Sequence, residues 1–231
     1  MIYPYTAFLH LAMTILSLAS LVYLFYRKRS LNSAAVGNYF NWFLLFFLYN
    51  IFLILPLALF GELNFISGIF YNFALLFLGL GAWQALATAL DFMAANSLLK
   101  KTVSALYLAG IAAAIGLHFA FPEIPRGTLD GNWVLWYSNQ SISLFYTLFM
   151  FIAGWLFALT FLKGINAMPA LLKFRGYCFV FAGFVLPFAA FYYFGAKNVM
   201  HIYFAFSFSI LGLLLFAAGN ILVGLFKESA S

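Results

Sequence analysis

Seven long apolar runs, each of about 20 residues or more, dominate this chain and are separated by short polar segments. They cover residues 5–26, 37–60, 65–93, 102–121, 134–162, 176–194 and 198–226. A helix of about 20 apolar residues is long enough to cross the hydrocarbon core of a bilayer, whereas barrel strands alternate in polarity over about ten residues. The sequence therefore predicts an all-α membrane protein whose single domain, residues 1–231, is a bundle of seven transmembrane helices.

The composition excludes an ordinary soluble domain. Hydrophobic residues make up 67% of the chain and charged residues only 7%, against about 45–50% and about 25% in soluble proteins. The formal net charge of +6 does not indicate nucleic-acid binding, because the basic residues stand at the ends of the apolar runs, as topology signals do. A single cysteine, Cys178, excludes an intrachain disulfide and a cysteine-based metal site.

The distribution of lysine and arginine predicts the orientation in the membrane. If the N-terminus is outside, only Arg126 and Lys197 of the eleven basic residues lie on the outer side. The cytoplasmic side then holds Arg27, Lys28, Arg29, Lys100, Lys101, Lys163, Lys173, Arg175 and Lys227. Basic residues are enriched in cytoplasmic loops. We therefore expect a multi-pass protein of the cell (inner) membrane with its N-terminus outside and its C-terminus in the cytoplasm.

The longest polar stretch is PEIPRGTLDGNWVLWYSNQ, residues 122–140, and this orientation puts it outside. Its prolines should end the fourth helix, while Trp133 and Trp136 should seat the start of the fifth at the membrane interface. Asn139 and Gln140 would then turn inward one turn below. We interpret the stretch as a lid over an outward-facing pocket.

Polar side chains within the apolar runs gather in the outer half of the predicted bundle. Such side chains are costly in lipid unless they face protein or water, so they are the candidates for function. The candidate ligand-binding residues are Asn72, Asn139, Gln140, Tyr146, Tyr192 and His201.

The three histidines all fall in this outer layer. If the first and last helices are neighbours, His10 and His201 could hold a haem iron or a divalent metal through neutral imidazoles, and His118 could complete the site if the fourth helix leans inward. The alternative is that all three are interfacial residues with a polar tip, because no pair has a spacing such as HxxxH that would force convergence.

Asp91 is the only acid within an apolar run, but it comes shortly before Asn96 and Lys100. An intramembrane carboxylate is a candidate for a proton or ion pathway. This position favours structural pairing with Arg27, Lys28 or a neighbouring basic residue instead. The last run has no lysine within the membrane for a retinal Schiff base, and no phosphate loop or nucleophile–histidine motif occurs. An enzyme is therefore not favoured.

Pro56 and Pro187 interrupt the second and sixth runs in similar contexts, LILPLALFG and FVLPFAAFYYFG. Divided into three helices, a linker helix and three more, the chain invites comparison with carriers built from parallel repeats, although proline is common in membrane helices in general. Small residues at 79–82 and 109–116 would let helix backbones approach closely, so we expect the third and fourth helices to be central.

Several segments are shared with a known class of membrane regions. They are Arg27-Lys28-Arg29 after the first helix, Trp42 in the second, Gly131-Asn132-Trp133 before the fifth, Lys173-Phe174-Arg175 before the sixth, and Pro187. In these the chain resembles the seven-helix N-terminal sensory region of bacterial membrane histidine kinases. The resemblance implies ligand sensing at the outer face and transmission to a cytoplasmic output. Because the sequence ends at Ser231 without a kinase, we expect such a sensor to signal through a partner.

Three functions of different class remain open. The first is a sensory or receptor-like protein that binds a small ligand in an outward-facing pocket. The second is a small-solute transporter that uses the proline-bent second and sixth helices. The third is a structural or assembly subunit of a larger membrane complex. The expected partners are the lipid bilayer and another membrane or cytoplasmic protein, with no nucleic acid.

Overall fold

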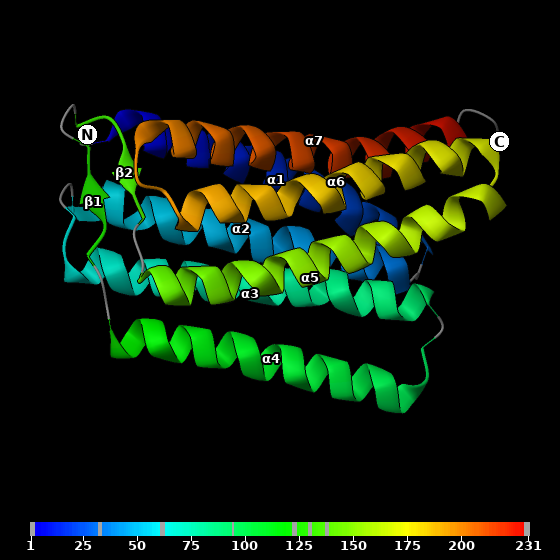
Figure 1. Ribbon diagram of the computed structural model, residues 1–231. Helices are drawn as coiled ribbons and strands as arrows, with labels where there is room; N and C mark the ends of the chain where they lie inside the picture. The colour runs from blue at the N-terminus through cyan, green and yellow to red at the C-terminus, as the bar shows by residue number, and fades with distance from the viewer. Residues whose placement is uncertain are drawn as a thin grey trace.

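Seven helices long and apolar enough to cross a membrane make up the computed structural model, as the sequence predicts (Figure 1). This count refers to the residues that the structure describes, 3–31, 34–60, 63–93, 95–121, 124–128, 131–136 and 139–228. The helices are α1 (Pro4–Leu31), α2 (Ala34–Phe60), α3 (Phe65–Phe92), α4 (Ser97–Ala120), α5 (Gln140–Gly164), α6 (Ala170–Phe194) and α7 (Val199–Glu228). The short strands β1 (Arg126–Gly127) and β2 (Val134–Leu135) pair as an antiparallel hairpin, and a 3-10 helix, η1 (Ile165–Ala167), follows α5.

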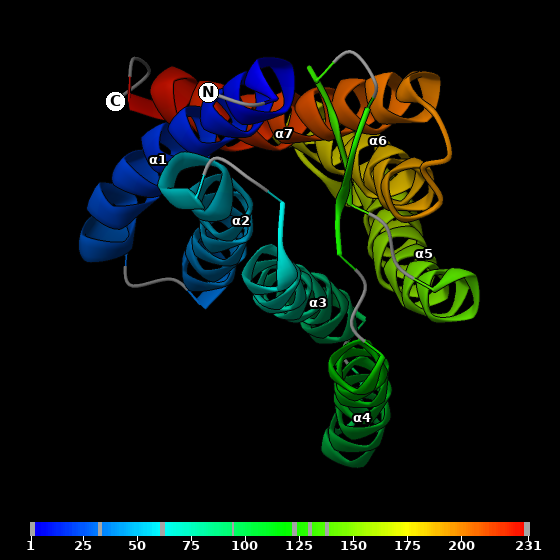
Figure 2. The ribbon, with the colours of Figure 1, turned by 90° about the vertical axis from the view of Figure 1, so that its left-hand side faces the viewer.

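Six of the helices form a ring in the order α1, α2, α3, α5, α6 and α7, and α7 returns to contact α1 (Figure 2). α4 lies outside this ring, against α3 and α5. The prediction that the third and fourth helices are both central is therefore wrong for the fourth. Small residues permit close packing but do not require it. On α4, Gly110 lies against Phe149 of α5, whereas a Cβ atom at Gly116 would meet no atom of another helix within 4 Å.

The two faces of α1 differ in their side chains: one face is exposed at the outside of the bundle, and the other packs against neighbouring helices. The outward face carries exposed, large apolar side chains: Phe8, Leu11, Ile15, Leu18 and Val22. The inward face carries buried polar side chains at intervals of three or four residues: Thr6, His10, Thr14, Ser17 and Ser20. The hydroxyls of the last three donate to main-chain carbonyls four residues earlier, so they are satisfied within the helix. The small polar face then allows close helix packing.

A close backbone crossing joins α5 and α6 at Gly154 and Gly183. A Cβ atom at Gly154 would lie 2.5 Å from Cγ of Pro187 and 2.7 Å from the carbonyl oxygen of Gly183. A Cβ atom at Gly183 would lie 2.8 Å from the carbonyl oxygen of Gly154. Only glycine at both positions lets the two helices approach this closely, and Pro187 packs into the space that Gly154 leaves.

Three predicted helix starts, at 134, 102 and 176, are wrong, because α5 begins at Gln140, α4 at Ser97 and α6 at Ala170. Strand β2 occupies the first residues of the predicted fifth run. The fourth helix starts earlier because the side chain of Asn96 accepts a hydrogen bond from the main-chain N–H of Leu99 at 2.7 Å and so caps the first turn. Polar residues that the sequence suggested were loop are therefore part of the first helical turns.

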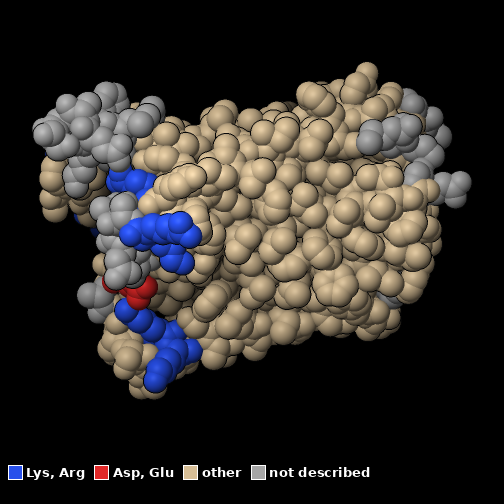
Figure 3. Space-filling model, turned by 180° about the vertical axis from the view of Figure 1, so that it is seen from behind, with Lys and Arg blue, Asp and Glu red and all other residues tan. Residues whose placement is uncertain are grey.

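Lysine and arginine side chains gather at one end of the bundle (Figure 3). This end contains the last turn of α1 with Lys28 and Arg29, the first turn of α4 with Lys100, and the first turns of α6 with Lys173 and Arg175. The other end carries the hairpin. The bundle therefore has one basic end, which matches the segregation of charge seen in the sequence.

Asp91, near the end of α3, pairs with Lys100 across the turn into α4, with Nζ 2.7 Å from Oδ1. This confirms the predicted pairing of Asp91 with a nearby basic residue. Both side chains are partly exposed, 35% for Lys100 and 56% for Asp91. We expect Asp91→Asn to lower the free energy of unfolding by about 1 kcal/mol or less, because exposed ion pairs contribute little. Thermal unfolding at low and high salt measures the loss, and a loss that high salt does not reduce would contradict this assignment.

Candidate functional site

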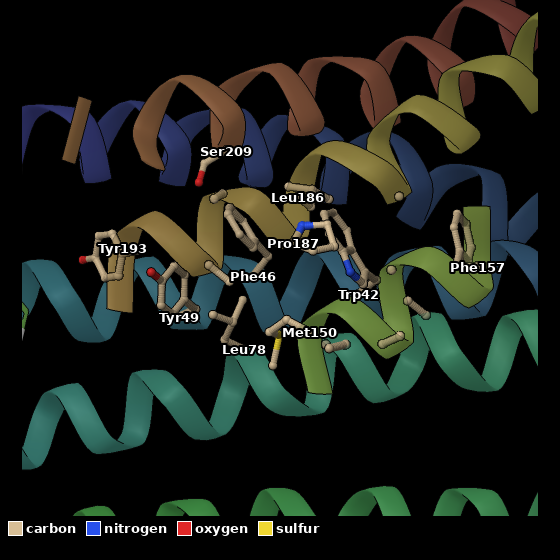
Figure 4. A pocket seen from close by; sticks show the side chains of 18 of the residues that line it. Trp42, Phe46, Tyr49, Leu78, Met150, Phe157, Leu186, Pro187, Tyr193 and Ser209 are labelled. Carbon is tan, nitrogen blue, oxygen red and sulfur yellow. The ribbon is translucent and has the colours of Figure 1, made fainter. Parts of the chain in front are cut away.

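A cavity lies at the centre of the bundle, between α2, α3, α5, α6 and α7 (Figure 4). Its empty volume is about 810 Å³, counted together with the space that opens to its surroundings. The cavity exists because several residues in its wall have small side chains or none: Gly81 on α3, Ala153 on α5 and Ala190 on α6. The close crossing of α5 and α6 forms part of the wall, because Gly154 and Pro187 also line the cavity.

The cavity is apolar along most of its length. None of the residues that line it, all in the described part of the chain, is charged. Figure 4 shows Trp42 and Phe157 toward one end and the phenol groups of Tyr49 and Tyr193 together at the other, which is the C-terminal end of α6. Ser209 on α7 adds one more hydroxyl between them. The cavity wall is therefore mainly apolar and aromatic and carries a few hydroxyl groups.

A buried hydrogen-bond network supports Tyr193, and Tyr49 packs beside this network. Nδ2 of Asn50 donates to the carbonyl oxygen of Phe46 at 2.9 Å, and Oδ1 of Asn50 lies 2.9 Å from Nδ1 of His10. Nε2 of His10 lies 3.0 Å from the hydroxyl oxygen of Tyr193. The ring of Tyr49 packs edge-on beside that of His10, with ring centroids 6.3 Å apart. His10 and Asn50 are completely buried, so this network joins α1, α2 and α6 and fixes the Tyr193 oxygen at the cavity wall.

The β1–β2 hairpin crosses the same end of the ring (Figure 2). The main-chain N–H of Val134 donates to Oγ1 of Thr6 on α1 at 2.9 Å. The ring of Trp133 packs against Tyr5 on α1 and Tyr203 on α7, with ring centroids 5.4 Å and 4.8 Å apart. The hairpin is therefore fastened to the first and the last helix of the ring.

Trp136 fastens the other side of this segment to α3. Its ring stacks on that of Tyr71 at 5.5 Å, and the Tyr71 hydroxyl donates to the carbonyl oxygen of Trp136 at 3.2 Å. Only 1% of Trp136 and 4% of Trp133 are exposed. The prediction that these tryptophans seat the start of the fifth helix at the interface is wrong, because both precede the helix and are buried in the cap that the hairpin forms.

Asn139 and Gln140 do not turn into the bundle. Both are exposed at the start of α5. The side chain of Asn139 accepts a hydrogen bond from the main-chain N–H of Ser141 at 3.0 Å and caps the helix. The expectation that they lie one turn below the start of the fifth helix is wrong, because the helix begins at Gln140 itself.

The tyrosine of α6 that lines the cavity is Tyr193 and not its neighbour Tyr192, which the sequence singled out. Tyr192 is partly exposed and packs on Phe204 and Phe208 of α7, with ring centroids 5.2 Å and 5.8 Å away. Adjacent residues of a helix point about 100° apart, so only one of the two can face the cavity.

Asn72 and Tyr146 are buried on α3 and α5, but neither lines the cavity. The hydroxyl of Tyr146 donates to the main-chain carbonyl oxygen of Leu75, which ties α5 to α3. The polarity of Tyr146 is therefore used to pack two helices.

The three histidines have three different settings. Both ring nitrogens of His10 are engaged, by Asn50 and Tyr193. His201 stands at the start of α7, where the main-chain N–H of Lys197 donates to its Nδ1 at 3.3 Å. His118 is on the peripheral helix α4. Across the described ranges, no group of three His, Cys, Asp or Glu side chains is close enough to hold a metal ion. The three histidines therefore do not come together as the haem or metal interpretation requires.

The candidate ligand-binding residues chosen from the sequence did not include three residues at this end of the cavity: Tyr49, Asn50 and Tyr193. A signal for Tyr193 exists in the spacing of Gly183, Pro187, Ala190 and Tyr193, which recur every three or four residues and so share one face of α6. Asn50 is signalled only by being an amide in the middle of an apolar run.

Comparisons with protein families and with curated protein sequences found no match for this chain.

Proposed function

We propose that this protein is a membrane receptor or sensor that binds a small, mostly apolar ligand in the cavity at the centre of the bundle. The cavity itself is the observation that carries this proposal. Small-molecule sites in proteins are concave, lined mainly by apolar and aromatic side chains, and contain a few fixed polar groups. Five helices build such a wall here, and the network of His10 and Asn50 holds the phenol group of Tyr193 in place.

The same proposal includes the orientation of the bundle. The basic end, with Arg27, Lys100 and Arg175, faces the cytoplasm according to the positive-inside rule. The hairpin then covers the outer end and serves as the lid of the cavity. Ligand binding changes the spacing of α5 and α6, whose crossing forms part of the cavity wall, and a partner protein reads this change at the basic end.

A small-solute carrier is the second candidate, because Pro187 lies within α6 and also lines the cavity. A proline-bent helix beside a central site is a common arrangement in carriers. Liposomes that contain the protein separate the two functions. A sensor is stabilised by its ligand without net uptake, whereas a carrier accumulates the solute and loses rate in Pro187→Ala.

Filling the cavity tests the proposed site directly. A Cβ atom at Gly81 would meet its nearest neighbour, Leu45 Cβ, at 3.7 Å, which is ordinary contact, so Gly81→Leu can fold and project its side chain into the cavity. We expect native mass spectrometry of gently extracted protein to detect a retained small molecule in the wild type, and at least a tenfold lower occupancy in Gly81→Leu.

Gly116→Leu is the matched control, because Gly116 is exposed on α4 and a Cβ atom there would meet no atom of another helix within 4 Å. It should retain the molecule as the wild type does. If the wild type retains no small molecule and is not stabilised by added ten-carbon probes such as 1-decanol or decane, the ligand-binding function is wrong. A second protein chain retained in fixed proportion would instead support a complex subunit.

A further inference from the structure

We propose that Arg175 is the centre of a second binding site, which takes a phosphate group at the basic end of the bundle. Arg175 lies in the second turn of α6 and is followed at intervals of four residues by Phe179 and Gly183, so the three share one face of the helix. That face points into the ring, because Gly183 lines the cavity. Arg175 itself does not line the cavity, so this site goes beyond the proposed receptor function and does not depend on it.

The guanidinium of Arg175 is held between α2, α6 and α7. Its Nη2 donates to Oδ1 of Asn220 on α7 at 3.1 Å. Its Cζ lies 5.3 Å from the ring centroid of Tyr39 on α2 and 5.2 Å from that of Phe179. All three partners are buried. A guanidinium that is already fixed in this way loses little freedom when it binds an oxyanion. Asn220 engages a single N–H group, and the guanidinium carries enough others for the paired contact that a phosphate makes.

The positive charge of Arg175 has no counter-ion in the described part of the chain. Its three partners, an amide and two aromatic rings, are neutral. Asp91, the one acidic residue whose side chain the structure describes, pairs with Lys100 instead. Arg175 is partly buried, and a charge removed from water without a partner is costly. A bound oxyanion would offset this cost, and the remaining exposure of Arg175 lets it reach the site.

A second guanidinium lies in the same corner of the basic end. The hydroxyl of Tyr23 on α1 donates to the main-chain carbonyl oxygen of Asn220 at 3.4 Å, and Cζ of Arg27 lies 5.9 Å from the centroid of the Tyr23 ring. A phosphate group presents oxygens in several directions, whereas a carboxylate presents two in one plane, so neighbouring guanidinium groups favour phosphate. Dissolved phosphate and the headgroups of anionic lipids both reach the basic end of a membrane bundle, so both are sources of this group (Figure 3).

Inorganic phosphate and an anionic phospholipid test the site in the intact chain. The protein is kept in dodecyl maltoside, a detergent without phosphate. One arm compares inorganic phosphate with chloride at equal ionic strength. The other arm compares phosphatidylglycerol with phosphatidylcholine at equal mole fraction. Dissociation constants come from the dependence of thermal unfolding on ligand concentration. We expect inorganic phosphate, phosphatidylglycerol or both to bind about tenfold or more tightly than the reference, as a hydrogen bond between charged groups allows.

Three variants locate the binding. Arg175→Gln removes the charge and should weaken binding about ten- to 100-fold, the range for a hydrogen bond to a charged group. Arg175→Lys keeps the charge but should still weaken binding, because an ammonium group cannot make the paired contact. Lys101→Gln is the matched control, since Lys101 is exposed near the start of α4, outside the ring. Its binding should stay within about twofold of the wild type, because salt screens exposed charges at a distance.

The two arms distinguish the sources of the phosphate group. Binding of phosphatidylglycerol without binding of inorganic phosphate identifies a lipid headgroup, and binding of inorganic phosphate shows that the site accepts a dissolved ion. The proposal is overturned if neither probe binds more tightly than its reference. It is also overturned if Arg175→Gln and Lys101→Gln weaken binding equally, since the attraction would then belong to the basic end as a whole. If Arg175→Gln does not fold, the comparison of Arg175→Lys with Lys101→Gln decides in the same way.

Discussion

Replacement of Gly154 by valine is expected to lower the free energy of unfolding by about 3 kcal/mol, because the crossing of α5 and α6 has no room for a side chain. The first added carbon already lies 2.5 Å from Cγ of Pro187 and 2.7 Å from the carbonyl oxygen of Gly183. One of these contacts is with main chain, so a side-chain rotation cannot relieve it and the helices must separate. Unfolding in mixed micelles, followed by near-ultraviolet circular dichroism, measures the loss.

Gly116→Val is the control for this prediction. It makes the same chemical change in a membrane helix, but a Cβ atom at Gly116 would meet no atom of another helix within 4 Å. Because valine is also no poorer a helix former than glycine, the free energy of unfolding should fall by no more than about 0.5 kcal/mol. Similar losses for the two variants would mean that the crossing of α5 and α6 does not determine the effect. Gly183→Val should behave as Gly154→Val does, because its Cβ atom would meet the Gly154 carbonyl oxygen.

The number of helices was predictable because the bilayer acts on each segment separately. A span needs sufficient length and apolar character, and both are local properties of the sequence. The same holds for the grouping of Arg27, Lys100 and Arg175 at one end, because successive spans must run in opposite directions. The pairing of Asp91 with Lys100 was also predictable, since only a short turn separates the two residues.

The place of α4 could not be predicted in the same way. Its run of small residues, 109–116, suggested a central helix, and Gly110 does make a close contact with Phe149 of α5. Other small residues of this run face outward, where they cost little in lipid. A sequence shows which faces can pack closely, but not which of several compatible faces finds a partner.

The cavity escaped prediction for a related reason. It is formed by the absence of side-chain volume at Gly81, Ala153 and Ala190, which come from three different helices. The choice between Tyr192 and Tyr193 depended on the rotation of α6 about its axis, and the apolar residues around both positions did not reveal it. His10 was singled out only as a possible haem or metal ligand or as an interfacial residue, and the partners that bury it, Asn50 and Tyr193, are 40 and 183 residues away along the chain.

Replacement of Trp133 by alanine is expected to detach the hairpin from the ring and to cost about 3–5 kcal/mol locally, the range for large aromatic side chains in a packed core. Trp133 is 4% exposed and contacts α1 through Tyr5 and α7 through Tyr203, so its removal leaves a gap between three elements. Hydrogen–deuterium exchange measures the effect at the main-chain N–H of Val134, which donates to Thr6. Exchange there should accelerate about 100-fold or more, because about 3 kcal/mol corresponds to that factor.

Trp155→Ala is the matched control, since Trp155 is 43% exposed on α5 and its loss should leave exchange in the hairpin unchanged. The exchange rate also tests the hairpin as the lid of the cavity. If the lid limits release, the dissociation of bound 1-decanol should accelerate in Trp133→Ala and remain at the wild-type rate in Trp155→Ala. Faster hairpin exchange with unchanged dissociation would leave the hairpin as a fastening between α1, α3 and α7, and the ligand would then have to enter the cavity between helices from the lipid.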